Sequence, residues 1–216
     1  MYIPAHFKPD EATVLALLDQ QGAADLVTWT SEGLMATMLP FLYDRPGSRR
    51  DTGELGSLVG HVARNNAQWR VPALGPALAI VRGPDAYISP SWYATKREHG
   101  RVVPTWNYVT AHVYGRLVIH DDVAWLEALV RRLTVHYESG RDHPWSVDDA
   151  PPEYVAGQLR AIVGVEVLIE RIEAKAKLSQ NRSRADIDGV IAGLDEAGRP
   201  AIADAMRRIQ VPQPES

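Results

Sequence analysis

Short runs of strand-forming residues, separated by turns, fill most of the first 120 residues and constrain the fold more than any other feature. The runs Asp25–Thr30 and Leu34–Tyr43 flank the turn Ser31-Glu-Gly33 and predict a β-hairpin. Further strands are predicted at Leu55–Arg64, at 77–81 and 86–89 on either side of a turn at Arg82–Asp85, and at Val103–Ile119.

Helical periodicity occurs before the first strands and again only after Asp121-Asp122. A short helix is predicted from Val14 to Gln21, and a longer one after Asp121-Asp122, with Trp125, Leu129, Leu133 and Tyr137 on one stripe. A helix from Pro151 to about Ile162, a strand over 164–172 and two short helices around Gly198 complete the pattern. This order predicts a mainly β fold with peripheral helices, of the α+β class, built on a small barrel. We expect residues 1–174 to form the barrel and residues 175–216 to form a C-terminal appendage.

Composition and net charge limit the cellular location and the partners that we expect for this chain. The 216 residues carry no cysteine, no apolar run long enough to cross a bilayer and no signal-peptide pattern at the N-terminus, so a cytoplasmic protein without a membrane role is expected. The net charge of -4 argues against broad electrostatic capture of DNA. A nucleic-acid partner would therefore need a local patch.

The first candidate for chemistry is the segment from His61 to Trp69, where a strand ends in a run of hydrogen-bond donors. Arg64, Asn65, Asn66 and Gln68 could together hold a phosphate, because guanidinium groups match phosphate oxygens and amides add neutral donors. The alternative is a solvated strand end.

Two further segments combine aromatic and polar residues. Ser89, Ser91, Trp92 and Lys96 could cover a planar ring and reach an anionic tail, although Trp92 could equally be a packing anchor. On the later strand, alternate faces carry Asn107 on one side and Trp106 and His112 on the other, with core packing as the alternative role.

Several other chemistries lack their patterns. The histidines show no paired metal-ligand spacing, and neither a glycine-rich phosphate loop nor a Gly-x-Ser-x-Gly elbow is present. The acidic pairs Asp121-Asp122 and Asp148-Asp149 precede predicted helices, so helix capping is their expected role. No metal site is expected, and no catalytic residue can be named.

Five ordered blocks resemble the PaiB-type family of flavin-binding transcriptional regulators: Tyr2–Phe7, His61–Arg64, Gly83–Tyr93, Val103–Tyr108 and Lys177–Asn181. The resemblance implies an FMN-binding split β-barrel of the pyridoxamine-phosphate-oxidase-like superfamily, and a homodimer with flavin at the subunit interface. The residues it suggests for FMN binding are Thr37, His61, Arg64, Asn65, Ser89, Ser91, Trp92, Lys96, Trp106, Asn107 and His112.

Three functions stay open at this point. The resemblance favours an FMN-binding regulator that acts as a homodimer and contacts DNA through a local patch. The alternatives are an FMN-dependent oxidoreductase of the flavin reductase or oxidase type, and a split barrel that binds haem.

Overall fold

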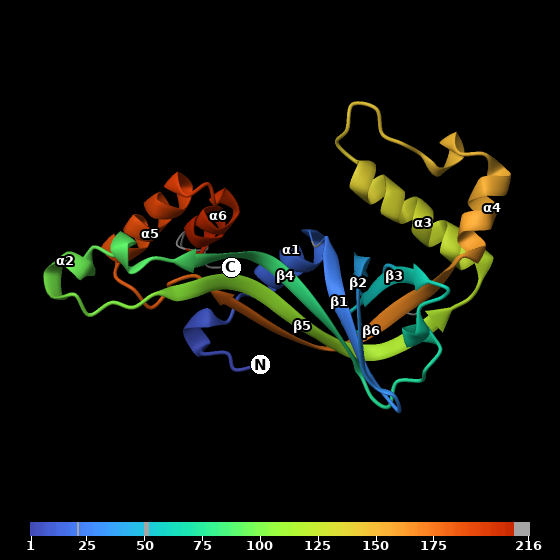
Figure 1. Cartoon of the computed structure of the whole chain (residues 1–216), viewed down its shortest axis with the longest axis horizontal. Helices are drawn as coiled ribbons and strands as arrows, with labels where there is room; N and C mark the ends of the chain where they lie inside the picture. The colour runs from blue at the N-terminus through green and yellow to red at the C-terminus, as the bar shows by residue number, and fades with distance from the viewer. Residues whose placement is uncertain (21, 50–51, 210–216) are drawn as a thin grey trace. The chain divides into compact units, whose positions relative to one another are not determined.

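The computed structural model describes residues 1–20, 22–49 and 52–209, and shows the expected mainly β architecture with peripheral helices (Figure 1). The strands close into a barrel in the order β1-β2-β3-β6-β5-β4. They are β1 (Ala23–Thr30), β2 (Gly33–Asp44), β3 (Ser57–Ala63), β4 (Ala77–Ile88), β5 (Thr105–His120) and β6 (Ile162–Lys177).

Contacts within the chain group it into two compact units. The first comprises residues 1–14, 82–111 and 174–216, and the second comprises residues 15–81 and 112–173. The strands β4, β5 and β6 contribute residues to both units. The expected domain boundary after residue 174 stays a prediction.

The first hairpin forms as the sequence predicts. β1 and β2 pair antiparallel from Ala23 opposite Pro40 to Thr30 opposite Gly33. Gly33 closes the turn with a φ of 104°, which a residue with a side chain rarely adopts. Thr30 stabilises the turn through its hydroxyl, which donates to the carbonyl oxygen of Gly33 at 2.9 Å.

The second expected hairpin is wrong. Residues Arg82–Asp85 do not turn but continue β4 as one strand of 12 residues from Ala77 to Ile88. The buried positions change from the odd residues Ala77, Ala79 and Val81 to the even residues Ala86 and Ile88, so the alternation shifts by one residue across 82–85 while the strand continues. Gly83 and Pro84 therefore lie inside a continuous strand, which has β1 and β5 as its neighbours in the barrel, and not in a turn.

Except for α2, which the sequence did not predict, the helices lie where periodicity placed them, with small shifts at their ends. They are α1 (Glu11–Gln20), α2 (Thr95–His99), α3 (Val123–Glu138), α4 (Pro152–Arg160), α5 (Arg184–Glu196) and α6 (Pro200–Arg208). Gln21, the expected end of the first helix, lies outside the described residues. The last strand is longer than expected, because β6 continues through Lys177.

The expected helix capping is confirmed for Asp122 and is wrong for Asp148-Asp149, because α4 begins at Pro152 without a side-chain cap. The Asp122 carboxylate accepts a hydrogen bond from the backbone N–H of Trp125 at 2.8 Å and begins α3. Asp149 instead lies inside a short 3-10 turn, where its carboxylate accepts from the N–H of Ser146 in a capping box.

The apolar stripe of α3 packs against β2 and β3. Leu129 and Leu133 form one buried cluster with Leu42 of β2 and Val59 of β3. This packing holds α3 against the neighbouring strands β2 and β3 of the second unit.

Two negative findings bear on function. No helix in the described part of the chain is both long and apolar enough to cross a membrane. Among the same residues, no group of three or more His, Cys, Asp or Glu side chains could hold a metal ion.

Candidate functional site

The donor-rich turn after β3 is fastened to the first hairpin. The Asn66 amide donates to the Thr37 hydroxyl at 2.9 Å, and Gln68 donates to the Leu26 carbonyl at 3.0 Å and to the Thr28 hydroxyl at 3.1 Å. Thr37, an expected FMN contact, is therefore used in holding the turn. The position of the turn beside β2 is fixed by these bonds.

Arg64 binds groups of its own chain. Its guanidinium forms a two-pronged ion pair with the Asp121 carboxylate and donates to the carbonyl oxygens of Arg160 and Ile162. Hydrogen bonding by Arg64 lowers the pKa of Asp121 below its usual value. Arg64 thus joins the end of β3 to the starts of α3 and β6, and a phosphate there would compete with Asp121.

Two exposed side chains of the same turn, Arg70 and Asn65, make fewer hydrogen bonds than Arg64. Arg70 is exposed and lies over Trp69, with its guanidinium carbon 5.2 Å from the ring centroid. Both side chains donate to the Arg64 carbonyl at 2.9 Å. Asn65 is exposed and has no hydrogen-bond partner within the residues that the structure describes. Arg70 and Asn65 are therefore the side chains most available to a phosphate.

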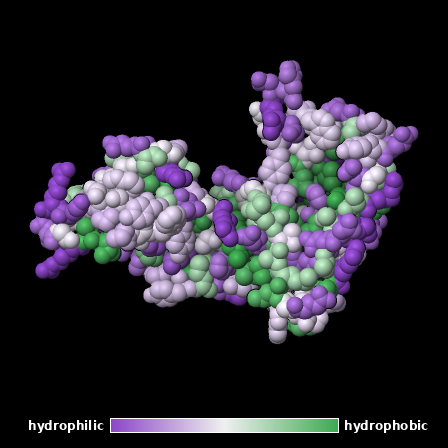
Figure 2. All heavy atoms as spheres, viewed as in Figure 1, coloured by the Kyte–Doolittle hydropathy of each residue, from purple (hydrophilic) through white to green (hydrophobic). Residues whose placement is uncertain are grey.

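An exposed apolar surface covers the outer side of the β1–β2 hairpin. Trp29, Leu34 and Met38 are 60%, 76% and 71% exposed, and Trp29 lies directly opposite Leu34 across the two strands. Figure 2 shows apolar residues, in green, gathered over this hairpin. We call Trp29, Leu34, Ala36 and Met38 the hairpin face. Thr37 and Met38 are neighbours that point to opposite faces of β2, so the donor-rich turn, which bonds Thr37, is attached to the side of β2 opposite the hairpin face.

Two expected histidines lie in the same unit. Burial lowers the pKa of His61, and its Nδ1 atom is buried with no hydrogen-bond partner among the described residues. Burial also lowers the pKa of His112, whose ring meets Tyr114 edge to face at 6.4 Å. Both histidines are therefore neutral near pH 7.

The other expected contacts belong to the first unit, and most have partners there. Ser89 accepts a hydrogen bond from the Ser91 N–H, and Lys96 donates to the Ser91 hydroxyl at 3.0 Å. Asn107 is fully buried and bonds Ser179 at 2.9 Å.

Two tryptophans of this unit have different surroundings. Trp92 packs against α5 where Gly189 and Gly193 leave room, which is the packing role that was the alternative for it. Trp106 is exposed and donates to Asp85 at 2.8 Å. Whether any residue of either unit contacts FMN stays a prediction.

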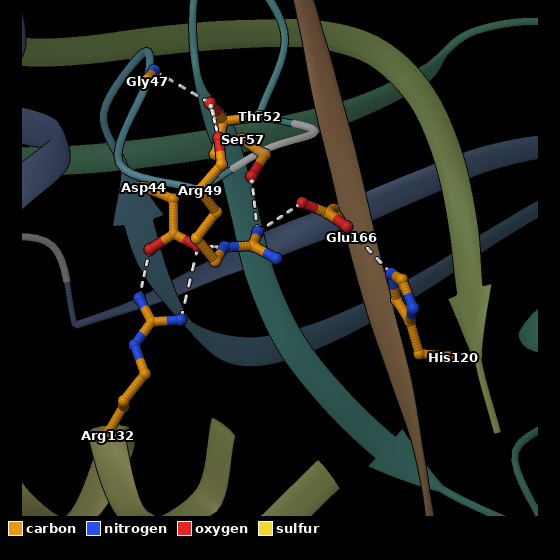
Figure 3. A network of polar contacts seen from close by, with 8 residues as sticks. All are labelled: Asp44, Gly47, Arg49, Thr52, Ser57, His120, Arg132 and Glu166. Atoms are coloured by element: carbon orange, nitrogen blue, oxygen red, sulfur yellow. Dashed lines mark hydrogen bonds and ion pairs between the residues drawn. The ribbon is translucent and has the colours of Figure 1, made fainter. Parts of the chain in front are cut away.

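A second polar cluster lies under α3 (Figure 3). Arg49 donates to Asp44 and to Glu166, each at 2.6 Å, and Arg132 of α3 pairs with the same Asp44. Glu166 also contacts His120 Nε2 at 2.8 Å, and His120 stacks on Trp125 with the ring centroids 4.0 Å apart. Asp44 and Glu166 are only 4% and 5% exposed at their side chains.

This cluster is a structural joint rather than a ligand site. Burial alone would raise the pKa of Glu166, but hydrogen bonds from Ser57, His120 and Arg49 and the charge of Arg49 lower it below the usual value. Asp44 therefore pairs with Arg49 and Arg132, and Glu166 contacts Arg49 and His120. A neighbouring pocket of about 570 Å³ is lined by Asp19, Leu42, Tyr43, Arg131, Arg132, Val135 and His136, and its two arginines already pair with carboxylates.

The second unit has the chemistry that FMN requires. Its phosphate needs cationic and neutral donors, which Arg70 and Asn65 provide at the turn, and its planar ring needs a flat apolar surface, which the hairpin face provides. The residues present therefore fit the cofactor.

Comparisons with known proteins agree with this fit. Residues 1–171 match the family described as "Putative FMN-binding domain". The chain is 36% identical over 205 residues to the Bacillus subtilis protein named protease synthase and sporulation protein PAI 2, covering 93% of this chain and 92% of that protein. This chain belongs to the PaiB-type family of FMN-binding domains. FMN is accordingly the cofactor that family membership assigns.

Solved structures confirm the split-barrel fold of this PaiB-type chain. A conserved hypothetical protein from Mycobacterium tuberculosis aligns with a TM-score of 0.56 at 12% identity, over 85% of this chain and 95% of that one. A flavocytochrome from Azotobacter vinelandii aligns with a TM-score of 0.55 at 17% identity, over 77% and 67% of the two chains. At these identities the likeness concerns the fold alone.

Sequence reasoning missed two parts of this site. Arg70 lies one residue beyond the segment from His61 to Trp69. Nothing in the sequence indicates that its guanidinium lies over the Trp69 ring. The hairpin face was missed because β2 is apolar on both sides, so the inward residues Leu39 and Phe41 could not be told from the outward Leu34 and Met38.

Proposed function

We propose that this chain is an FMN-binding regulator that acts as a homodimer, with the FMN phosphate at the 64–70 turn and the flavin ring on the hairpin face. The observation that carries the proposal is that the turn with Arg70 and Asn65, which have no carboxylate partner among the described residues, is bonded to β2, the strand that also exposes an apolar surface. Arg64 then acts mainly by holding the turn in place.

The homodimer is supported by the size of the side chains that the hairpin face exposes. Contiguous exposed apolar residues on a soluble domain mark an interaction surface. A second copy is the simplest occupant, because a two-fold interface pairs one surface with itself and most homo-oligomers use such symmetry. Flavin and partner would then cover the hairpin face together.

The regulatory role is supported by the Bacillus relative, whose name associates it with protease synthase and sporulation. Bound flavin supplies hydride and electron transfer chemistry. In a regulator, the chain would position the flavin so that its redox state changes the affinity for a partner. With a net charge of -4, DNA binding requires a local basic patch on the dimer.

The test measures DNA binding in two flavin states. Duplexes selected from a random pool by the FMN-loaded protein are titrated by fluorescence anisotropy with oxidised and with dithionite-reduced protein, at low and moderate salt. We expect sequence-selective binding that changes at least about tenfold with flavin state, a typical coupling strength. Absence of selected sequences, together with multiple-turnover oxidation of NADH or NADPH, contradicts the regulator and supports the oxidoreductase.

A further inference from the structure

A cationic and aromatic surface occupies one face of the β5–β6 ribbon in the first unit. Asn107 is buried on the other face, where its amide bonds Ser179 and contacts the sulfur of Met206 in α6. Its neighbours Trp106 and Tyr108 therefore point to the face opposite α6, since side chains alternate along a strand. Figure 1 shows the N-terminal segment on this opposite side of the ribbon from α5 and α6.

Two lysines of β6 share this face with the aromatic residues. Lys175 Nζ lies 5.6 Å from the Tyr108 ring centroid and 5.8 Å from the rings of Tyr2 and Phe7, and it donates to the Tyr2 carbonyl at 3.1 Å. Lys177 Nζ donates to the Thr105 hydroxyl and to the Trp106 carbonyl, the latter at 2.8 Å. We call Trp106, Tyr108, Lys175 and Lys177 the lysine face.

The positive charge of the lysine face has no carboxylate partner. All hydrogen-bond acceptors of the two lysines are neutral, and neither lysine pairs with an acid among the residues that the structure describes. The nearby Asp85 accepts from Trp106 Nε1 at 2.8 Å. Partial burial lowers the pKa of Lys177, and the charges of Lys175 and Arg182 lower it further. An anion placed here would relieve this repulsion.

The aromatic residues give the surface a second recognition element. Trp106 is 51% exposed and meets Tyr87 edge to face at 6.3 Å between ring centroids. An exposed indole beside ammonium groups can stack on a planar ring while the lysines bind an attached phosphate.

Three of the five sequence blocks that define the family resemblance meet at this surface. Tyr2–Phe7 supplies the rings around Lys175, Val103–Tyr108 supplies the two aromatic residues of the face, and Lys177–Asn181 begins at the second lysine. The proposed FMN site on the second unit uses none of these three blocks.

We propose that the lysine face is a separate binding site for a nucleotide, with its phosphate on Lys175 and Lys177 and its base on Trp106. The inference does not depend on where FMN binds. The planar ring distinguishes a nucleotide from free phosphate, because only the nucleotide uses Trp106.

The test titrates AMP and, separately, inorganic phosphate into the full chain by calorimetry, with the protein first saturated with FMN. We expect AMP to bind more tightly than phosphate. The Lys175→Ala/Lys177→Ala double variant should lose at least about tenfold in AMP affinity, because two charge-assisted contacts are removed. Trp106→Ala should weaken AMP by about fivefold, through lost stacking, and leave phosphate binding unchanged.

Controls separate the site from general effects. Arg97→Ala removes an exposed charge of α2 in the same unit and should bind AMP like the wild type. If circular dichroism shows that the double variant is unfolded, Lys177→Gln replaces it, because glutamine keeps a long polar side chain with a hydrogen-bond donor but removes the charge. The proposal is overturned if AMP does not bind at about 1 mM, if the lysine variants bind it as Arg97→Ala does, or if FMN displaces it competitively.

Discussion

Replacement of Glu166 by alanine is expected to lower the free energy of unfolding by about 3 kcal/mol, the lower end of the range for breaking a buried ion pair. Glu166 is 5% exposed and accepts from Arg49 at 2.6 Å and contacts His120 at 2.8 Å. Its removal leaves both partners without their shared acceptor beneath α3. A shift in the urea midpoint, measured by far-ultraviolet circular dichroism, checks this value.

A matched control lies on the same strand. Glu170 of β6 is exposed, so Glu170→Ala should change stability by less than about 0.5 kcal/mol. Glu166→Gln tests the charge separately. Because the pKa of Glu166 is lowered in the folded chain, its charge stabilises the fold above the usual value of 4.5, and this contribution is lost as pH falls through the folded pKa. The difference between wild type and Glu166→Gln should therefore shrink from pH 6 to pH 3, and an unchanged difference contradicts the assignment.

Gly115→Ala is the second large expected effect, with a loss of about 3 kcal/mol, the upper end of the usual range for overpacking. A Cβ atom at this position of β5 would lie 2.0 Å from the carbonyl oxygen of Leu168 in β6. The obstacle is backbone, which cannot rotate away as a side chain can, so the two strands must separate. Thermal unfolding of the variant measures the cost.

The same substitution at another glycine should have the opposite sign. Gly157 lies inside α4, where a Cβ atom would come only within 3.9 Å of an Arg160 side-chain nitrogen. Gly157→Ala should stabilise the chain by about 1 kcal/mol through higher helix propensity. If both variants are equally stable, the close approach of β5 and β6 at Gly115 is not a constraint on the fold.

The sequence was most informative where local chemistry decides structure. Ser31-Glu-Gly33 predicted the first hairpin because Gly33 must adopt a positive φ, and Asp122 predicted the start of α3 because its side chain caps the helix. The predicted turn at Gly83-Pro84 was wrong, because this local turn signal lies inside the continuous strand β4.

The candidate site was predictable only in part. The donor-rich turn could be seen in the sequence, but the partner of Arg64 could not, since Asp121 lies 57 residues away. The joint around Glu166 was equally hidden, because Arg49, Asp44 and His120 meet it only after the barrel closes. Long-range partners of this kind depend on strand order, which periodicity does not determine.

The most direct test of the central claim is an FMN titration followed by absorbance and sedimentation, on the wild type and on Met38→Glu. The wild type should take up about one FMN per chain as a dimer, whereas Met38→Glu should be monomeric and bind FMN at least about tenfold more weakly, because a second carboxylate then lies opposite Asp25 on the hairpin face. Val123→Glu, on an exposed residue of α3, should leave both properties unchanged. Failure of the wild type to bind FMN, a Soret band with added haem in its place, or a Met38→Glu dimer with wild-type affinity would contradict the account.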